Sequence, residues 1–503
     1  MRGKRRVGTG AGTGSLRLPT LWRQAGIVAM AAALIWLTGC GTVPPPDFIP
    51  QPLPPDVWTS YGHGVANDFN NQADTQVTPG NVHGLQLRWQ TRTAAMVTSN
   101  PIVSGSTLYF GTWNGTVEAA NRYTGRVLWT ASVANGPDHP VVHGSPLLYE
   151  GALYVAATNG YIYAFDPASG AQRWRSPQPV FPVGTPDWIE SGIVPYGNTL
   201  YLGIGGQNDV DGEWGGVAAV NALNGSTRWV TNLDTLFSKG MYDAAVFGTP
   251  ALLPAHDMLF VATGNPIFRG AALTGPLPYT DAVVALSMKS GKVIWARETH
   301  DGSNDLDFLA GPTIWYGQGG QPMVGAGEKD GWFYAFNALT GRMAWKASLT
   351  PLGSQTLLMN PAAAGYGQLY IGTFDIPLAV LYNGIFPDTY QPPATGRLVA
   401  LNADTGKVEW SFAMPSAVPV APVVGDGMVF ADSSNGEIYA LDAHAGRALW
   451  WNNVHGEIRH AEAALTLAGD QLFVPVAVPA AWQNPTANTL SGAVTMFSLR
   501  PAA

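Results

Sequence analysis

The chain has 503 residues, with 60 glycines, 39 prolines and 18 tryptophans but a single cysteine. Its formal net charge is −8 at pH 7, and this acidic balance argues against a nucleic-acid-binding protein and against electrostatic binding to anionic lipid. The length exceeds one ordinary hydrophobic core, so we expect several domains or a repeat architecture. The many glycines and prolines favour short strands joined by turns.

The first 39 residues are predicted to be a lipoprotein signal peptide. A basic start without acidic residues precedes an apolar run, Ala25–Leu37, that is too short to span a bilayer comfortably. The run ends in Leu37-Thr38-Gly39-Cys40, which resembles the lipobox of bacterial lipoproteins, so we expect Cys40 to carry the lipid. An ordinary signal peptide followed by a chance cysteine is the alternative.

Residues 40–56 are predicted to be a lipidated, proline-rich, extended tether. Removing the leader removes six basic residues, which leaves 20 Lys and Arg against 34 Asp and Glu, a net charge of about −14. A lipoprotein leader implies the bacterial cell envelope, and Gly41 after the lipidated cysteine favours the periplasmic side of the outer membrane. With Cys40 alone, no disulfide within the chain and no CxxCH haem attachment is possible.

A repeated unit that ends in tryptophan fills the rest of the chain. Each copy predicts a strand, a tight turn and a strand, because apolar residues alternate and Asn/Asp-x-x-(Thr/Ser/Asn/Ala)-Gly supplies a hairpin turn. The copies include Gly115–Trp129 and Gly160–Trp174, and later ones end at Trp229, Trp295, Trp345, Trp410 and Trp450. A second hairpin precedes most copies, as in Pro101–Gly111, so two hairpins make a four-stranded blade.

The ends of the repeat predict a closed ring. A large planar indole can fill the wedge between neighbouring blades, which explains why each unit ends in tryptophan. Trp89 stands alone before the first full copy, and the last hairpin, ending at Val494–Leu499, has no tryptophan strand after it. We therefore predict an all-β, eight-bladed β-propeller over residues 57–503, whose N-terminal strand completes the last blade.

Extra length in the repeat is predicted to form a binding face. The spacing between tryptophans varies from 40 residues (Trp89 to Trp129) to 66 (Trp229 to Trp295). Large insertions on a rigid scaffold usually shape a binding surface. The longest are Ile204–Gly215, Pro266–Thr280 and Ile376–Thr395.

Several segments then resemble one family, the quinoprotein (PQQ-dependent) alcohol dehydrogenases, over essentially the whole chain after the leader. The segments are Trp58-Thr59-Ser60-Tyr61-Gly62 followed by Asn81–Trp89, Ala262-Thr263-Gly264-Asn265-Pro266, His300–Phe308 with Pro312, and Gly327-Glu328-Lys329-Asp330-Gly331. The stretch Asp305-Leu306-Asp307-Phe308 is similar to the haem-less, polyvinyl-alcohol-oxidising branch of the family. The resemblance implies an eight-bladed propeller of quinoprotein type that oxidises an alcohol.

The resemblance also implies residue roles and partners. Asn265 would ligate, through its amide oxygen, a calcium ion or a lanthanide beneath PQQ, and the metal would act as Lewis acid. Asp305 would be the base that takes the alcohol proton, with Asp307 a further metal oxygen. Lys329 would contact the quinone oxygens and stabilise developing charge. Electrons would leave to an external acceptor, a cytochrome c or a quinone.

Two positions depart from the family pattern. Gln207 stands where the family has a metal-ligating glutamate, and Asp209, Asp211 or Glu213 could compensate for the missing charge. Phe247 stands where a tryptophan usually forms the aromatic floor under PQQ. The vicinal disulfide that lies over PQQ in many relatives is impossible here.

Plainer alternatives stay open for each site. Gly264-Asn265-Pro266 is also a common turn, clustered aspartates are usually a solvated loop, and Lys329 is equally an exposed turn lysine. Two other functions compete with the enzyme. A lipid-anchored propeller with this repeat is also the form of the scaffold lipoprotein of the outer-membrane β-barrel assembly machinery, and a degenerate relative could bind a ligand without turning it over.

Overall fold

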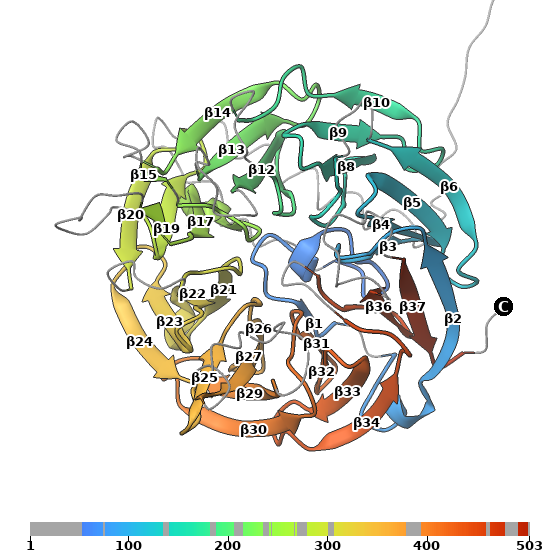
Figure 1. The fold of residues 1–503 in the computed structure, drawn as a ribbon, viewed down its shortest axis with the longest axis vertical. Helices are drawn as coiled ribbons and strands as arrows, with labels where there is room; N and C mark the ends of the chain where they lie inside the picture. Colours follow the sequence, from blue (N-terminus) through green and yellow to red (C-terminus); the bar gives the residue numbers. More distant parts are fainter. Residues whose placement is uncertain are drawn as a thin grey trace, which may run out of the picture. The chain divides into compact units, whose positions relative to one another are not determined.

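Eight antiparallel sheets are arranged as blades around one axis, which confirms the predicted eight-bladed β-propeller (Figure 1). The computed structural model describes residues 53–73, 76–133, 140–181, 188–205, 215–234, 241–242, 244–265, 267–268, 279–299, 306–378, 394–458, 463–477 and 491–500. The leader, Cys40 and most of each long insertion lie outside these residues. Within the described ranges, no helix has the length and apolar character needed to cross a membrane.

In blades 1 to 7, the four strands follow one another in chain order from the innermost to the outermost. Blades 1 to 4 are β3 (Ile102–Ser104), β4 (Thr107–Gly111), β5 (Thr116–Asn121) and β6 (Val127–Ser132); β7 (Leu147–Tyr149), β8 (Ala152–Ala156), β9 (Ile162–Phe165) and β10 (Gln172–Arg175); β11 (Val194–Tyr196), β12 (Thr199–Ile204), β13 (Gly216–Asn221) and β14 (Thr227–Asn232); and β16 (Ala251–Leu253), β17 (Met258–Ala262), β19 (Ala282–Ser287) and β20 (Val293–Glu298). Blades 5 to 7 are β21 (Thr313–Tyr316), β22 (Pro322–Gly327), β23 (Trp332–Asn337) and β24 (Met343–Ser348); β26 (Ala363–Gly365), β27 (Gln368–Gly372), β29 (Gly396–Asn402) and β30 (Val408–Met414); and β31 (Val423–Gly425), β32 (Met428–Asp432), β33 (Glu437–Asp442) and β34 (Ala448–Asn453).

Blade 8 is built from both ends of the chain, as predicted. Its first three strands are β35 (Thr466–Ala468), β36 (Gln471–Ala477) and β37 (Gly492–Ser498), and the N-terminal strand β2 (Gln86–Thr93) is the fourth. In the antiparallel register, Gln86 faces Ser498 and Thr93 faces Gly492. The ring is therefore closed by hydrogen bonds between strands rather than by a covalent link.

The repeated tryptophans dock onto the turn of the next blade. Trp129 of blade 1 donates its indole N–H to the Pro167 carbonyl of blade 2 over 3.0 Å. The same indole covers Gly170, whose φ of +72° would strain any other residue. Trp89, Trp229, Trp295, Trp345 and Trp410 likewise lie against Gly125, Gly291, Gly341, Gly406 and Gly446. The turn glycine of each repeat thus accommodates the tryptophan of the blade before it.

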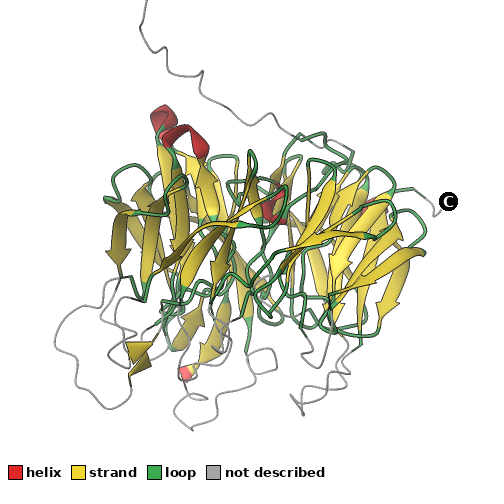
Figure 2. Cartoon of the chain, turned by 90° about the horizontal axis from the view of Figure 1, so that it is seen from above, coloured by secondary structure: helices red, strands yellow, loops and turns green. Residues whose placement is uncertain are grey.

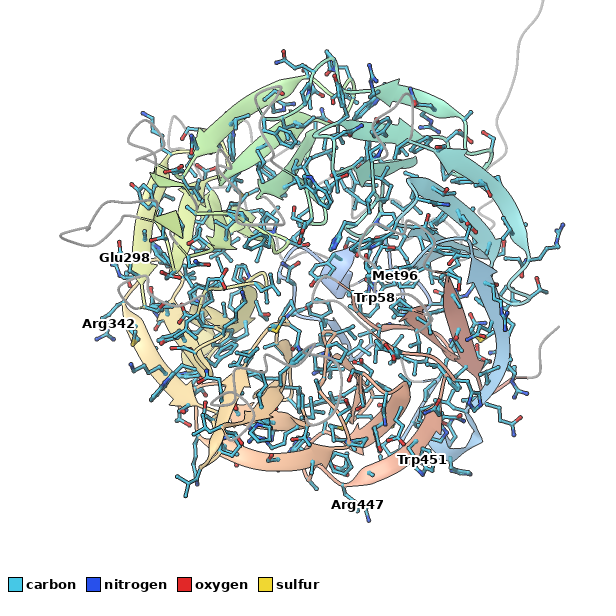
Figure 3. The ribbon with its side chains drawn as sticks, in the orientation of Figure 1. Trp58, Met96, Glu298, Arg342, Arg447 and Trp451 are labelled. Atoms are coloured by element: carbon cyan, nitrogen blue, oxygen red, sulfur yellow. The ribbon has the colours of Figure 1, made fainter. Side chains whose placement is uncertain are left out.

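Residues 57–72, which we call the axial segment, follow the inner strands around the ring; the segment includes the short turn η1 (Tyr61–His63) and is the blue trace in the middle of Figure 1. Trp58 is fully buried and lies near the middle of the ring (Figure 3). Main-chain hydrogen bonds of 2.6–2.9 Å join the segment, in chain order, to Val103, Leu148, Leu252, Ile314, Ala364 and Val424, one residue from the inner strand of each of six blades. The side-chain amide of Asn71 donates a further hydrogen bond to the carbonyl of Leu467 in blade 8 over 2.8 Å.

Further short elements lie outside the blade pattern. The strand β1 (Asn70–Asn71) adds to blade 7 in parallel with β31, and the turns η2 (Val82–Gly84), η4 (Pro254–His256) and η5 (Gln318–Gly320) lie in connections. Two ribbons are separate from the blades: β15 (Met241–Tyr242) with β18 (Ile267–Phe268), and β25 (Ser354–Leu357) with β28 (Phe374–Pro377). In the side view, the strands run between the two faces of the ring and loops join them at both faces (Figure 2). The β25–β28 ribbon bears on the candidate site.

Candidate functional site in blades 4 and 5

Main-chain hydrogen bonds connect four of the segments singled out in the sequence. Gly264, beside Asn265, donates to the Ala245 carbonyl in the Phe247 loop over 2.8 Å. Phe308, beside Asp307, donates to the Thr263 carbonyl over 3.4 Å. Lys329 donates in turn to the Asp307 carbonyl over 3.1 Å. The loops that carry Phe247, Asn265, Asp307 and Lys329 therefore form one continuous patch across blades 4 and 5.

A buried ion pair lies at one end of this patch. The Lys329 ammonium is 2.6 Å from Oδ1 of Asp307, and the two side chains are only 16% and 3% exposed. Neither residue is the solvated turn residue that the plainer alternatives describe. Because charges are rarely buried without a partner, each side chain helps to fix the position of the other.

The turn that carries Lys329 is shaped by Asp330. The Asp330 carboxylate accepts the Trp332 N–H over 2.8 Å and the Tyr334 hydroxyl over 2.6 Å. Burial, followed by the hydrogen bond to Asp330, raises the pKa of Tyr334, so the phenol stays protonated and remains a donor. Asp330, two residues before β23, thus ties the turn that carries Lys329 to the start of that strand.

Phe247 is held by a close approach of two loops. A Cβ on Gly248 would lie 2.0 Å from the Gly311 nitrogen, and one on Gly311 would lie 2.3 Å from the Thr249 carbonyl oxygen, so both positions require glycine. From the axial segment, the buried Asn67 side chain donates to the carbonyls of Thr249 (2.8 Å) and Pro250 (3.1 Å). Phe247 itself is 8% exposed. Its loop is therefore tied to blade 5 and to the axis.

The structure adds residues that sequence reasoning missed. The Thr299 hydroxyl lies 2.6 Å from Oε1 of the buried Glu328 and 2.8 Å from the carbonyl oxygen of the buried Asp281. Asp281 also donates its N–H to the Gly264 carbonyl over 2.9 Å. Glu328 precedes Lys329 in the sequence, so considering the neighbours of Lys329 would have singled it out. Asp281 follows an insertion and carries no comparable signal.

Other predicted site residues lie outside the described part of the chain. They are Asp305, Gln207, Asp209, Asp211, Glu213 and the lipidation residue Cys40. Within the described part, no group of three or more His, Cys, Asp or Glu side chains is arranged to hold a metal ion. The metal assignments of Gln207, Asn265, Asp305 and Asp307 accordingly remain predictions.

Family models match the chain in separate parts. The model described as "Outer membrane protein assembly factor BamB" matches residues 75–188 and 387–500. The model described as "Glucose/ethanol/alcohol dehydrogenase, beta-propeller domain" matches residues 224–360, which include Phe247, Asn265, Asp307 and Lys329. The dehydrogenase-type match thus coincides with the candidate site, whereas the other match covers blades at the two ends of the chain.

Individual proteins show the same two similarities. A polyvinylalcohol dehydrogenase of a Pseudomonas species is 25% identical over 470 residues, covering 82% of this chain and 69% of that protein. The crystal structure of quinohemoprotein alcohol dehydrogenase from Comamonas testosteroni superposes with a TM-score of 0.73 at 18% identity, covering 90% and 82%. BamB from Moraxella catarrhalis gives a TM-score of 0.54 at 15% identity, covering 82% and 99%.

Fold and site together define an eight-bladed propeller whose polar, charged cluster is built from loops of two neighbouring blades. The matched family models and the dehydrogenase relatives support a PQQ-dependent alcohol dehydrogenase-like family of β-propellers for this chain. The family resemblance drawn from the sequence motifs is confirmed.

Proposed function

We propose that the protein is a PQQ-dependent dehydrogenase that oxidises an alcohol. The observation that carries this proposal is the buried Lys329–Asp307 ion pair, joined by main-chain hydrogen bonds to the Asn265 and Phe247 loops. The related polyvinylalcohol dehydrogenase supports the same reaction class.

The side chains present fit the cofactor and metal of such an enzyme. Asn265 is partly exposed, so its amide oxygen is available to a hard cation, and Asp307 supplies a carboxylate nearby in the same patch. Phe247 offers an apolar ring on a loop fixed by Gly248 and Gly311. When bound, PQQ would supply a two-electron acceptor, and calcium or a lanthanide would supply a Lewis acid.

The chain's own residues then have separate tasks. An aspartate carboxylate accepts the hydroxyl proton of the alcohol. The family resemblance assigns this task to Asp305, and Asp307, whose carboxylate is held in one position by the ion pair with Lys329, is the second candidate. Lys329 orients that carboxylate and supplies positive charge to the site. Electrons leave to an external acceptor, a cytochrome c or a quinone.

The test begins with cofactor binding by the purified full chain. PQQ is added with calcium, and separately with a lanthanide, and binding is followed by the absorbance of the cofactor. A dye-linked assay then covers primary, secondary and polymeric alcohols. Stoichiometric binding with turnover establishes the dehydrogenase, and the base is whichever of Asp305→Asn and Asp307→Asn abolishes turnover while binding is retained. No binding with either metal would refute the proposal.

A scaffold in outer-membrane protein assembly is the second candidate, favoured by the family model that matches residues 75–188 and 387–500. Binding of an assembly partner by a chain that binds no PQQ would support it. We further propose that the protein is lipidated at Cys40 and held on the periplasmic side of the outer membrane. Labelling of the wild-type chain, but not of Cys40→Ala, by a radioactive fatty acid would support the anchor, and equal labelling of both would refute it.

A further inference from the structure

The backbone of Lys329 is held from outside its own blade. The Lys329 carbonyl accepts a hydrogen bond from Nε2 of Gln355 over 3.1 Å. The neighbouring Glu328 carbonyl accepts the Leu358 N–H over 3.3 Å. Both donors belong to the segment that leads from blade 5 to blade 6, whereas Lys329 lies in the turn between β22 and β23. The Lys329 turn therefore depends on this connecting segment for its position.

Gln355 lies on the β25–β28 ribbon. The two strands pair in antiparallel register, with Gln355 opposite Ile376 and Thr356 opposite Asp375. Each strand has four residues, and beyond their own pairing the ribbon meets blade 6 through one bridge between Asp375 and Thr395, just before β29, with main-chain hydrogen bonds of 2.8 and 3.1 Å. An isolated two-stranded ribbon is marginally stable in water. Something other than its own strand pairing must therefore hold the ribbon in place.

A buried ion pair anchors the ribbon to blade 6. The Asp375 carboxylate is contacted by Arg397 of β29 in a fork, with Nε 2.6 Å from Oδ2 and Nη2 3.0 Å from Oδ1. The hydroxyls of Thr356 (2.6 Å) and Thr373 (3.1 Å) also donate to it. Asp375 is 4% exposed and Thr356 is fully buried. Arg397 additionally donates to the Leu349 carbonyl at the end of blade 5.

We propose that the β25–β28 ribbon is a brace that positions Lys329, with Gln355 as the positioning residue and the Asp375–Arg397 pair as the anchor of the brace. The ribbon transmits the rigidity of blade 6 to a lysine of blade 5. Because Lys329 also contacts Asp307, loosening the brace moves both charged groups of the candidate site. The effect on turnover rests on the proposed dehydrogenase function, whereas the structural effect does not.

The test compares variants of the full chain by hydrogen–deuterium exchange without added cofactor. Gln355→Glu keeps the shape of the side chain but removes the N–H donor, and Gln355→Leu removes it without adding charge. We expect amide exchange in residues 327–331 and at Leu358 to rise about tenfold in both, as the loss of one hydrogen bond predicts, while β23 and β29 stay protected. Unchanged exchange in both variants would overturn the brace.

The anchor is tested in the same way. Arg397→Lys loses the two-pronged contact, and we expect faster exchange in the ribbon as well as in the Lys329 turn. Asp166→Asn is the matched control, because it breaks the Arg173–Asp166 pair on blade 2, which has no contact with the ribbon. Faster exchange in the ribbon without any change in the Lys329 turn would show that the two are not coupled and would overturn the proposal.

In protein loaded with PQQ and metal, Gln355→Leu should lower kcat about tenfold or more with KM nearly unchanged, since misplacement of a site group by a fraction of an ångström affects the reacting geometry more than binding. Faster exchange with unchanged kcat would refute the positioning role. If the wild-type chain binds no PQQ, the proposed function fails, and the exchange experiment still decides whether the brace exists.

Discussion

The indole of Trp129 in blade 1 lies directly over Gly170 in blade 2, so that a Cβ on Gly170 would meet Cε3 of the tryptophan at 2.5 Å. This contact between a tryptophan and a turn glycine recurs around the ring. Because it joins one blade to the next, it is the contact through which the repeat makes a propeller rather than a row of separate hairpins.

Gly170→Ala should destabilise the ring much more than Gly151→Ala. Both glycines have φ near +70° (+72° and +71°), but a Cβ on Gly151 would have no atom within 4 Å. The backbone strain is therefore matched, at about 1 kcal/mol. Displacing the indole adds about 2 kcal/mol or more at Gly170. Guanidinium unfolding followed by tryptophan fluorescence measures the difference, and equal midpoints would contradict the docking role.

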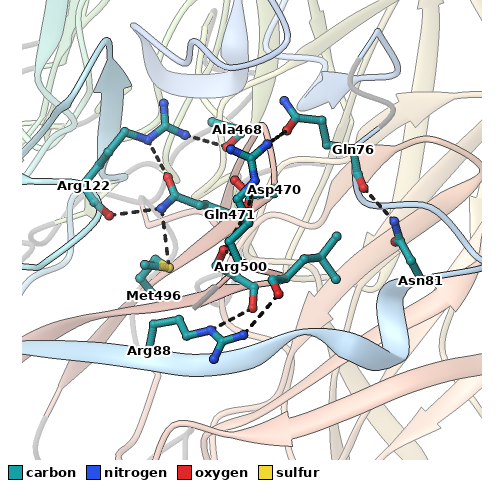
Figure 4. Close-up of polar contacts among 11 residues, drawn as sticks. Gln76, Asn81, Arg88, Arg122, Ala468, Asp470, Gln471, Met496 and Arg500 are labelled. Atoms are coloured by element: carbon teal, nitrogen blue, oxygen red, sulfur yellow. Dashed lines mark hydrogen bonds and ion pairs between the residues drawn. The ribbon is translucent and has the colours of Figure 1, made fainter. Parts of the chain in front are cut away.

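Arg122→Met should loosen the contact between blade 1 and blade 8, which we call the seam because blade 8 contains strands from both ends of the chain (Figure 4). The buried guanidinium donates to Oε1 of Gln471 over 2.5 Å, and to the carbonyls of Ala468 and Asp56 over 2.6 and 2.8 Å. Leaving such buried acceptors unpaired costs about 1–3 kcal/mol each. We expect a loss of about 3 kcal/mol or more in unfolding free energy and faster hydrogen exchange in β2 and β37.

Arg126→Met is the control for the seam, since Arg126 is exposed in the turn that follows Arg122. It should leave both the unfolding midpoint and the exchange of β2 unchanged. Arg122→Lys should behave like Arg122→Met, because an ammonium group cannot reproduce the several directions of a guanidinium. If β2 exchanges its amide hydrogens as slowly in Arg122→Met as in the wild-type chain, closure of the ring does not need the Arg122 side chain.

Asp68→Asn should change how stability depends on pH. Burial raises the pKa of Asp68 from 3.8 to about 7, with backbone hydrogen bonds opposing the rise. For a raised pKa, the contribution of the group to stability is fully present below pH 3.8 and is lost as pH rises through about 7. The melting temperature of Asp68→Asn should therefore increase relative to wild type between pH 4 and pH 7.5.

Asp166→Asn should show the opposite trend, which makes it the control for Asp68. The hydrogen bond from Arg173, the first cause, lowers the pKa of Asp166 to about 2. A lowered pKa gives a contribution that is present above pH 3.8 and is lost as pH falls toward 2. Differential scanning calorimetry of both variants and wild type, from about pH 2 to pH 7.5, measures the two trends. A pH-independent difference between Asp68→Asn and wild type would rule out titration of Asp68.

Lys329→Met should destabilise the chain even without cofactor. Removing one partner of a buried ion pair leaves the other charge buried and costs about 3–5 kcal/mol. Asp307→Asn should also destabilise, and the double variant should lose less than the two single variants together, because the contact is broken only once. Additive losses, measured by denaturant unfolding, would show that Lys329 and Asp307 are not energetically coupled.

The propeller could be predicted from the sequence because its determinants are local and repeated. The spacing of Trp129, Trp174 and their counterparts marks the outer strands, and the glycine of each turn marks the hairpins. The unpaired Trp89 at one end and the final hairpin at the other were sufficient to predict that β2 closes blade 8. Each of these signals occurs within one repeat or at a chain end.

The rest of the site could not be predicted, because it depends on contacts between repeats. The sequence singled out Lys329 and Asp307 separately, but nothing in their spacing shows that their side chains meet. Gln355 lies in a segment without repeat character, and Arg397, although it lies in the repeat strand β29, becomes meaningful only when blades 5 and 6 are adjacent. The axial segment has no strand pattern, although its backbone bonds to six blades in turn.

The seam in blade 8 has a consequence for biosynthesis. As a nascent chain emerges from its N-terminus, β2 is made before any of its partners, and β37, with which it pairs, is made last. Until β37 has been made, β2 presents an unpaired edge that invites aggregation, and the axial segment lacks the later inner strands that satisfy its backbone. The ring can therefore close only after β37 has been made, and its rate-limiting folding step should be the pairing of β2 with β37.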